Sequence, residues 1–539
     1  MPVIESRIDP KSKNFAANRL AMLALIEEVK ALENKIREHS ARARPKFEQR
    51  GQLLPRERLA LLLDRDRPFV PVSSLAGYQM HDDDGDASIS GGGQIAGIGT
   101  VAGVNCAILA SDSGIKGGAL SPMGVRKILR LHAIAMENRL PMVNLIESAG
   151  ANLFRQSELF VLGGRTFRNQ ARMSAAGIPQ ITVVHGSSTA GGAYLPGLSD
   201  YTIAVRDRAK IFLAGPPLLK AALGEDASDE ELGGAVLHAG VTGLAEQMAE
   251  DDAHAIAIAR DTVAKLGWNE SQPAPSKRTW QEPRYPIEDI LGIVPSDYRK
   301  PYDSREVIAR LLDGSDFLEF KPLYDAQTIC GTGAIEGQTC AIIANNGPIT
   351  PQGSVKAAQF IQLCCQADTP IIYLHNTTGY MVGKDAEAGG AIKHGAKMIQ
   401  AIANASVPQL TLHIGASFGA GNYGMCGREY EPRFIFAWPN YRIAVMGGEQ
   451  AAGVMKTVEI AKYKRRGEKA PKEQIDKMHQ SIIDNIDRES KALYATARLW
   501  DDGIVDPRDS RKLLGYLLGI CREAEHRSLK PNSFGVARM

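Results

Sequence analysis

The chain has few of the residues that mark secreted, membrane-spanning or nucleic-acid-binding proteins. Only seven of its 539 residues are cysteine, an odd number without a Cys-x-x-Cys pair, which argues against a disulfide framework and a zinc site. Aromatic residues make up 6%, and no apolar run reaches the ~18 residues that a membrane-spanning helix needs. The 63 basic and 61 acidic side chains nearly cancel, so no strong field attracts nucleic acid or anionic lipid. We expect a cytoplasmic protein without a metal site.

The length and composition indicate a globular protein with two large domains. A chain of 539 residues with 44% apolar and 23% charged residues exceeds what one ordinary core holds. Residues 269–289 are rich in proline and polar residues, which is typical of a linker. The run "AMLALIEEVKALENKIREHS" (residues 21–40) has apolar residues at helical spacing. We predict a short N-terminal segment over residues 1–22 and domains over residues 23–280 and 285–530.

The two halves of the sequence resemble each other. The stretch "GIPQITVVHGSSTAGGAYLPG" matches "SVPQLTLHIGASFGAGNYGMC", which places Pro179 and Pro408 at equivalent positions. Upstream, Pro141 and Pro370 are separated along the chain by the same interval as Pro179 and Pro408. In each copy, short β-branched runs alternate with Ala-rich helical stretches. The pattern predicts an internal duplication of an α/β domain.

Both copies carry a run of small residues directly after a predicted strand. In the second copy the run is "GASFGAGNYGM", residues 415–425. It lacks the Gly-Lys-Ser/Thr ending of a phosphate-binding P-loop and the acidic residue that follows a dinucleotide fingerprint. Backbone N–H groups in such a turn can hold a developing oxyanion, and glycine lets a reacting carbonyl come close to them. Tight packing of a strand against a helix also favours glycine, so a purely structural role is the alternative.

A protein nucleophile or base is not evident in either copy. There is no Gly-x-Ser-x-Gly motif, and His185 and His413, on equivalent strands, are interpreted as buried structural residues. Glu147 follows a predicted strand and is a candidate general acid or base, but its counterpart in the second copy is Asn376. The acidic run His81–Asp86 is interpreted as a solvated turn, with cation binding as the alternative.

With these loops, the sequence resembles the carboxyltransferase (β) subunits of biotin-dependent acyl-CoA carboxylases. The most specific strings are "TAGGAYLPG", "GASFGAGNYGMCGREYEPRF", "VMGGEQAAGVM" and "ARLWDDGIVDP". They are most similar to the branch that carboxylates β-methyl-α,β-unsaturated acyl-CoAs, the geranyl-CoA and 3-methylcrotonyl-CoA carboxylases. The resemblance implies an enzyme that forms a C–C bond and has two crotonase-like domains of the ClpP/crotonase superfamily. The first would take the acyl-CoA and the second the carboxybiotin.

The resemblance also implies where the chemistry takes place. Gly191 and Gly192 would hold the thioester oxyanion, while Ala420 and Gly421 would hold the ureido oxygen of biotin. In the family mechanism carboxybiotin releases CO2, the biotin nitrogen takes the γ-proton of the substrate, and the resulting dienolate attacks CO2. Further residues are implied as substrate-binding or biotin-side: Lys116, Gly117, Gly118, Ala149, Gly150 and Gly163 for the substrate, and Phe418 and Tyr423 for biotin.

One departure from the family pattern bears on the substrate. In "ANLFRQSELFVLGGRTFRNQ", Gly163 stands where the methylcrotonyl enzymes carry a phenylalanine. The lost ring leaves volume for additional methylenes, each worth about 0.8 kcal/mol when buried, which favours geranyl-CoA. The alternative is that Gly163 and Gly164 form a tight turn. A second departure, the prolines of "NNGPITPQG", has no evident reason in the sequence.

The sequence contains neither an Ala-Met-Lys-Met biotinylation motif nor a recognisable ATP-binding region. The resemblance therefore implies a separate α subunit that carries biotin and consumes ATP and bicarbonate. It further implies a β hexamer within an α6β6 assembly, each active site lying between domains of two subunits. We expect a bacterial geranyl-CoA carboxylase subunit of acyclic terpene catabolism. The alternatives are a 3-methylcrotonyl-CoA carboxylase of leucine catabolism, a membrane-associated biotin-dependent decarboxylase, and a scaffold without activity.

Overall fold

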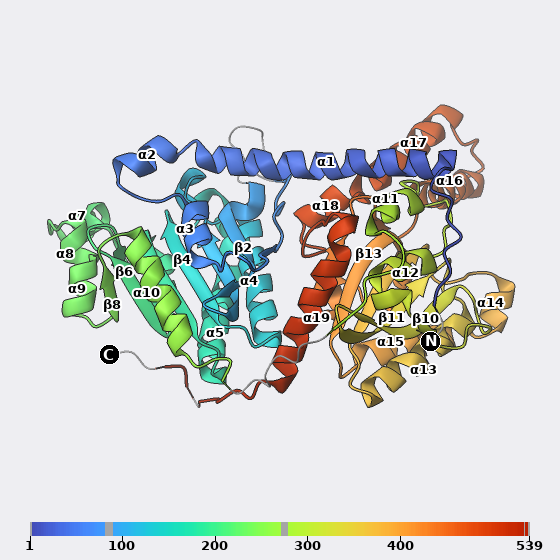
Figure 1. Cartoon of the computed structure of the whole chain (residues 1–539). Coiled ribbons are helices and arrows are strands. Elements are labelled where there is room, and N and C mark those ends of the chain that lie inside the picture. Colours follow the sequence, from blue (N-terminus) through green and yellow to red (C-terminus); the bar gives the residue numbers. More distant parts are fainter. Residues whose placement is uncertain (1–2, 81–89, 271–278, 533, 537–539) are drawn as a thin grey trace. The chain divides into compact units, whose positions relative to one another are not determined.

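The computed structural model describes residues 3–80, 90–270, 279–532 and 534–536 (Figure 1). The predicted turn at His81–Asp86 lies outside these residues. The chain forms two compact units, each described separately below. Unit 1 comprises Met1–Lys30, Lys277–Thr496 and Trp500–Gly519, and unit 2 comprises Ala31–Ser276, Ala497–Leu499 and Ile520–Met539. Each terminal segment is thus assigned to the unit built from the opposite half of the chain, and the predicted domain limits stay predictions.

Unit 2 is built on an eight-stranded mixed sheet. Its strands are β1 Val70–Pro71, β2 Gln94–Val101, β3 Val104–Ser111, β4 Met142–Ser148, β5 Gln180–Thr189, β6 Tyr201–Val205, β7 Lys210–Phe212 and β8 Gln247–Ala249. The order is β1-β2-β3-β4-β5-β6-β8. Strand β7 pairs with the last residues of β5, after the part of β5 that pairs with β6. The β2–β3 pair is antiparallel, whereas β3 to β6 and β8 run parallel. The carboxyl ends of the parallel strands therefore share one edge.

The helices of unit 2 cover this sheet. They are α2 Arg44–Gln49, α3 Pro55–Leu62, α4 Pro122–Glu137, α5 Gln156–Ala176, α6 Tyr194–Leu198, α7 Pro216–Leu223, α8 Asp229–Gly233, α9 Ala235–Gly240 and α10 Asp252–Lys265. Leu59 and Leu62 of α3, with Ile256 and Val263 of α10, pack against alternate residues of the strands, such as Val183. The long helix α1, Lys13–Ala41, contributes residues to both units.

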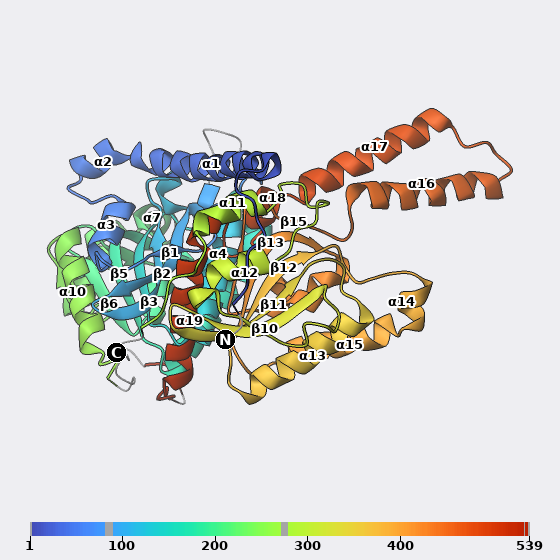
Figure 2. The same ribbon diagram turned by 45° about the vertical axis from the view of Figure 1, so that its right-hand side comes forward.

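Unit 1 has a seven-stranded mixed sheet. Its strands are β9 Leu318–Glu319, β10 Thr328–Ile335, β11 Gln338–Asn345, β12 Ile371–Thr377, β13 Gln409–Phe418, β14 Phe434–Ala437 and β15 Arg442–Ala444. Their order is β14-β13-β12-β11-β10-β9, with β15 paired to β13. The helices are α11 Ile290–Ile293, α12 Arg305–Leu311, α13 Pro351–Gln366, α14 Lys384–Ala388, α15 Ala391–Ala403, α16 Gly448–Arg465, α17 Lys472–Glu489, α18 Ala492–Ala497 and α19 Ser510–His526. The last residues of α18 and α19 belong to unit 2. Figure 2 shows α16 and α17 as a hairpin that extends from the rest of unit 1.

The predicted duplication is confirmed element by element. Strands β4 and β12, strands β5 and β13, and helices α4 and α13 all begin at the same interval along the chain, the one that separates Pro179 from Pro408. The preceding hairpins, β2–β3 and β10–β11, are slightly further apart. Both sheets run from this antiparallel hairpin into parallel strands. Gly191 and Ala420 lie in equivalent short 3-10 turns, η4 Ala190–Ala193 and η7 Gly419–Gly421.

The two equivalent helices start in the same way. Ser121 Oγ accepts from the N–H of Gly124 at 3.0 Å, and Thr350 Oγ1 accepts from the N–H of Gly353 at 2.8 Å. In each helix the next residue is a proline, which suits the first helical position because its missing N–H would have no partner there. Pro351, unexplained in the sequence, therefore begins α13.

The crowded glycine in the first turn of α4 allows a test of the fold. A Cβ on Gly124 would overlap the carbonyl oxygen of Gly92, whereas a Cβ on Gly164 in α5 would have no atom within 4 Å. We expect Gly124→Ala to destabilise the chain by about 1–3 kcal/mol, the usual cost of overpacking. Gly164→Ala should instead stabilise α5 by about 0.5–1 kcal/mol. Urea unfolding of both variants measures this, and equal midpoints would contradict the packing at Gly124.

Candidate active site

In unit 2, the small-residue loop follows directly on β5. Thr189 is extended, Ala190 adopts a left-handed conformation with φ of 53°, and Gly191 and Gly192 follow in η4. Gly191 is exposed and Gly192 is half-buried. The first N–H groups of a helical turn have no partner within that turn, so this loop offers backbone donors. Helix α6 behind it has only five residues, so its dipole adds little to these donors.

The loop of unit 1 repeats this backbone after β13. Gly419 has φ of 54° and stands at the position of Ala190. Ala420 is exposed, whereas Gly421 is buried against the segment that follows β12. A Cβ on Gly421 would lie 2.8 Å from the Cα of Gly379. The two loops therefore have the same conformation, but Gly421 is packed more tightly than its counterpart Gly192.

In both units, a side chain from the adjacent strand crosses the glycine that precedes the loop. A Cβ on Gly186 would lie 2.7 Å from Cγ of Glu147, and a Cβ on Gly415 would overlap the amide of Asn376. The ladder between the two strands shifts register at this point in each unit, next to Ser148 and next to Thr377. These two glycines therefore have a packing role.

Glu147 is a structural acceptor in unit 2. Its carboxylate accepts from Arg58 Nη1 at 2.7 Å, from Ser113 Oγ at 2.9 Å and from Gln52 Nε2 at 3.3 Å. The side chain is buried beneath Gly186. Its oxygens are thus occupied by three donors of its own unit, which leaves the general acid/base hypothesis for Glu147 without support.

Arg58 is also connected to His185, through the carboxylate of Asp252. Arg58 Nε donates to Asp252 at 3.1 Å, and His185 Nδ1 lies 2.7 Å from the other oxygen of Asp252. Burial alone would raise the pKa of Asp252, but the hydrogen bond to His185 and the nearby positive charge lower it to about 2. Burial lowers the pKa of His185. The interpretation of His185 as a buried structural residue is confirmed.

His413 is a core residue of unit 1. It is fully buried, and its ring stacks on Tyr441 with centroids 4.8 Å apart. Burial lowers its pKa well below the usual value, so the ring is neutral. The structural interpretation of His413 is confirmed as well.

The predicted substrate residues of the loops after β3 and β4 come together. Lys116, Gly117 and Gly118 form a 3-10 turn, η2, and the N–H of Ala149 donates to Gly117 O at 2.9 Å. Ser148 Oγ donates to Gly118 O at 2.8 Å and accepts from the N–H of Gly150 at 3.1 Å. Because β3, β4 and β5 are parallel neighbours, these loops and Gly191 lie at the same sheet edge, where α/β proteins bind ligands.

Gly163 lies inside helix α5, so the tight-turn alternative is wrong. A Cβ there would have no atom within 4 Å. One turn later on the same face is Phe167, whose ring tip lies 3.8 Å from a Cβ built on Gly191. The Phe167 ring also lies 5.5 Å from that of Tyr194. Gly163 thus leaves open space on the side of α5 that carries Phe167, the residue next to Gly191.

The two predicted biotin-side residues differ in position. Phe418 is buried, and its ring packs edge-on against Tyr298 with centroids 5.0 Å apart. Tyr423 is 49% exposed and stacks on Tyr430 at 6.2 Å. Only Tyr423 therefore presents its ring beside Ala420, and Phe418 supports the loop from the core.

The sequence reasoning missed two residues of the site, Phe167 and Gly379. Gly379 is the counterpart of Gly150, because the two are separated by the same interval as the other repeated positions, so the repeat itself contained the signal. Among the described residues, no group of three or more His, Cys, Asp or Glu side chains can hold a metal ion. None of the described helices is long and apolar enough to span a membrane.

The sequence matches known proteins over most of its length. Residues 46–532 match the family model described as carboxyl transferase domain. Over 542 residues, the chain is 46% identical to the probable biotin-dependent acyl-coenzyme A carboxylase beta2 subunit of Mycobacterium tuberculosis, and the match covers 100% of both chains. It is also 46% identical over 543 residues to the mitochondrial methylcrotonoyl-CoA carboxylase beta chain of Dictyostelium discoideum, with 100% of this chain and 91% of the relative covered.

Among solved structures, the crystal structure of the beta subunit of geranyl-CoA carboxylase from P. aeruginosa matches over 100% of both chains. The TM-score is 0.94 and the sequence identity is 60%. These matches confirm the predicted α/β carboxyltransferase fold and the family suggested by the small-residue loops. The chain belongs to the carboxyl transferase domain family.

Proposed function

We propose that this chain is the carboxyltransferase subunit of a biotin-dependent acyl-CoA carboxylase that acts on geranyl-CoA. The observation that carries the substrate assignment is the open space at Gly163, one helical turn from the Phe167 ring beside Gly191. The identity of 60% to a geranyl-CoA carboxylase beta subunit supports the same substrate. Methylcrotonyl-CoA is the alternative, because a relative with that name is 46% identical over the full chain.

The two loops would supply backbone donors for two oxyanions. The N–H groups of Gly191 and Gly192 would donate to the thioester oxygen of the acyl-CoA, and those of Ala420 and Gly421 to the ureido oxygen of biotin. Carboxybiotin, when bound, would supply the CO2, and the biotin nitrogen left by that loss would accept the γ-proton. Loss of one donor from such a site typically costs about 3 kcal/mol of transition-state stabilisation. A protein base is not required, in keeping with the structural role of Glu147.

The substrate pocket is proposed to follow the face of α5. The rim that contains Gly117, Gly118 and Ala149 would hold the thioester end, near Gly191. The acyl chain would then pass Phe167 and extend toward Gly163. The distal isoprene unit of geranyl-CoA has room there because nothing lies within 4 Å of a Cβ at this position.

We propose that the chain assembles as a β hexamer and works with a biotin-carrying α subunit in the cytoplasm of a bacterium. ATP and bicarbonate would be used on the α subunit.

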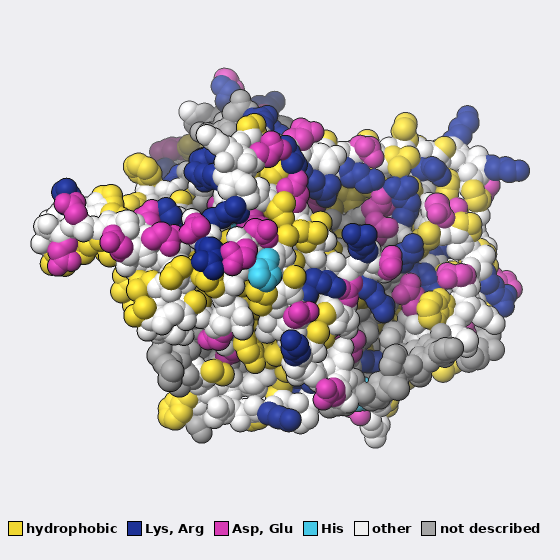
Figure 3. Space-filling model, turned by 60° about the vertical axis from the view of Figure 1, so that its left-hand side comes forward, with side chains coloured by type: hydrophobic (Ala, Val, Ile, Leu, Met, Phe, Trp, Pro, Cys, Tyr) yellow, Lys and Arg dark blue, Asp and Glu magenta, His cyan; other side chains and the backbone are white. Residues whose placement is uncertain are grey.

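On helix α16 four large apolar side chains are 42–52% exposed: Val454, Met455, Val458 and Ile460. On the face drawn in Figure 3, charges of both signs are intermixed and apolar side chains gather between them. The exposed apolar side chains of α16 are the candidate contact with another protein.

The assembly and the division of labour can be tested together. The purified chain alone should show no biotin on a streptavidin blot, no ATP-dependent carboxylation, and a hexameric mass by light scattering. Mixed with the α subunit, it should carboxylate geranyl-CoA in a bicarbonate-dependent reaction, and propionyl-CoA poorly. Turnover of methylcrotonyl-CoA without geranyl-CoA would shift the assignment to the alternative. A biotin-positive band or a fully active monomer would refute the subunit model.

The oxyanion loop of unit 2 allows a clean substitution. A Cβ on Gly192 meets no atom closer than Ser188 Oγ at 3.9 Å, so Gly192→Val should fold normally. Its branched side chain should block the approach of the thioester and lower kcat/KM at least about a hundredfold. Gly197→Val is the control, because Gly197 also has open space. Gly421→Val is less informative, since crowding against Gly379 would disturb the loop itself. Equal activity of Gly192→Val and its control would contradict the assignment.

Chain-length selection is tested at Gly163. We expect Gly163→Phe to lower kcat/KM for geranyl-CoA about ten- to a hundredfold more than for methylcrotonyl-CoA, because only the longer acyl chain needs the filled space. Gly164→Phe is the matched control, because Gly164 is the next residue of α5, is exposed and has equally open space around a Cβ. Both assays use the same α subunit, so that the carboxybiotin supply cancels. An equal loss with both substrates would show that Gly163 does not select chain length.

A further inference from the structure

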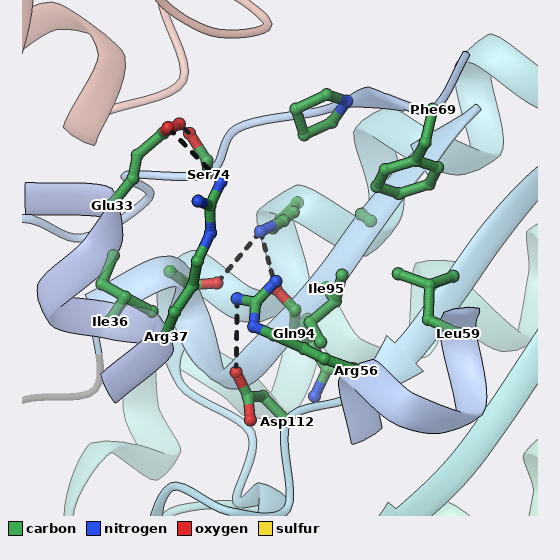
Figure 4. Close-up of a pocket in the computed structure, with 14 residues that line it drawn as sticks. Glu33, Ile36, Arg37, Arg56, Leu59, Phe69, Ser74, Gln94, Ile95 and Asp112 are labelled. Atoms are coloured by element: carbon green, nitrogen blue, oxygen red, sulfur yellow. Dashed lines mark hydrogen bonds and ion pairs between the residues drawn. The ribbon is translucent and has the colours of Figure 1, made fainter. Parts of the chain in front are cut away.

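Unit 2 contains a cavity of about 260 Å³, with a mixed polar and apolar lining, that is lined by none of the predicted site residues. It lies between the end of α1, the start of α3, strand β2 and helix α4 (Figure 4). Its charged lining consists of three cations, Arg37, Arg56 and Lys127, and two carboxylates, Glu33 and Asp112. The cations thus outnumber the carboxylates in a confined volume.

The two arginines of this cavity have no close ion pair with its carboxylates. Arg37 Nη2 lies 3.8 Å from Glu33, and Arg56 Nη2 lies 3.9 Å from Asp112, both near the outer limit of an ion pair. Glu33 accepts a closer hydrogen bond from Ser74 at 2.6 Å, and Asp112 accepts one from Ser40. Hydroxyl groups thus contact these carboxylates more closely than the arginines do.

Lys127 adds a buried amine to the same cavity. Its Nζ donates to the carbonyl oxygens of Gln94 at 2.7 Å and Gly91 at 3.1 Å. Burial, and after it the positive charge of Arg56, lower the pKa of Lys127 to about 7. Burial lowers the pKa of Arg56, Asp112 raises it in part, and Arg37 lowers it by a smaller amount than Asp112 raises it. The cations of this cavity therefore repel one another.

Two buried donors of the cavity lack a hydrogen-bond partner. They are the side-chain amide Nε2 of Gln94, a residue only 4% exposed, and Nε of Arg56. Buried polar groups in folded proteins are nearly always paired, and an unpaired donor costs free energy. Both orphaned atoms are donors, so the partner they need is an acceptor. An anion would satisfy them and would also relieve the repulsion among the cations.

We propose that this cavity binds an oxyanion of the phosphate class, held by Arg37, Arg56, Lys127 and the side-chain amide of Gln94. A tetrahedral oxyanion presents several acceptor oxygens, which matches donors arriving from α1, α3, β2 and α4. The phosphate belongs either to the free inorganic ion or to a phosphate group of coenzyme A. The proposal does not depend on the carboxyltransferase reaction, because its test measures binding without turnover.

Calorimetric titration of the full chain with inorganic phosphate, against chloride at equal ionic strength, tests the site. Arg37→Gln and Arg56→Gln should each weaken phosphate binding about tenfold, the usual loss for one charge-assisted hydrogen bond. Gln94→Leu should weaken it without changing the charge. Arg50→Gln, which removes an exposed arginine outside the cavity, is the matched control and should bind as the wild type does. The arginine side chains are 55% and 38% exposed, so both variants should fold.

Competition distinguishes the two sources of the phosphate. If coenzyme A displaces inorganic phosphate and binds more weakly to Arg56→Gln, the cavity holds a phosphate group of coenzyme A, and 3′-dephospho-coenzyme A shows which one. If phosphate binds equally well at saturating coenzyme A, the ligand is the free ion. The proposal is overturned if phosphate binds no better than chloride. It is also overturned if Arg50→Gln weakens phosphate binding as much as Arg56→Gln does.

Discussion

Both candidate loops depend on a side chain that crosses a glycine on the neighbouring strand. Glu147 lies over Gly186, and Asn376 lies over Gly415. Any Cβ at these glycines would collide with the crossing side chain, and the paired strands shift register there. Beyond the shift, β5 pairs with β7 and β13 pairs with β15 up to the start of each loop. The crossing thus marks the point at which each strand changes partner, just before the loop that the proposed reaction needs.

The side chain that crosses the glycine is charged in unit 2 and neutral in unit 1. A carboxylate crosses the glycine in unit 2, and a buried carboxylate needs partners. Arg58 supplies the charge and is itself held by Asp252, so the strand end is tied to α3 and α10. Asn376 in unit 1 is neutral and needs no buried arginine. The duplicated loops thus share a backbone conformation although their neighbouring strands carry different side chains.

The fold could be predicted from the sequence because the repeat preserves local features. Strand ends, small-residue loops and the constant interval between equivalent positions can all be read from the sequence. Long-range packing cannot be read from the sequence. The pair Gly163-Gly164 left a tight turn open as an alternative, but the helical residues around it outweigh the low propensity of glycine, and α5 continues through it. The placement of Phe418 on the biotin side stays a prediction, and the sequence did not show that Tyr298, from a distant segment, packs against its ring in the core. Pro351 had no evident reason in the sequence, and the structure supplies one, because Thr350 caps α13 and Pro351 is its first residue.

The described glycines divide into crowded and open positions, and a crowded position is explained by packing alone. Gly186, Gly415 and Gly421 are glycine because a Cβ would collide with a neighbour. Packing explains them completely. Gly163 and Gly192 have ordinary backbone angles and space for a Cβ, so folding does not require glycine at either position. A helix interior such as that of α5 would be more stable with alanine at Gly163. In the proposed reaction, the open space at Gly163 would hold the end of the acyl chain, and that at Gly192 would let the thioester approach the backbone.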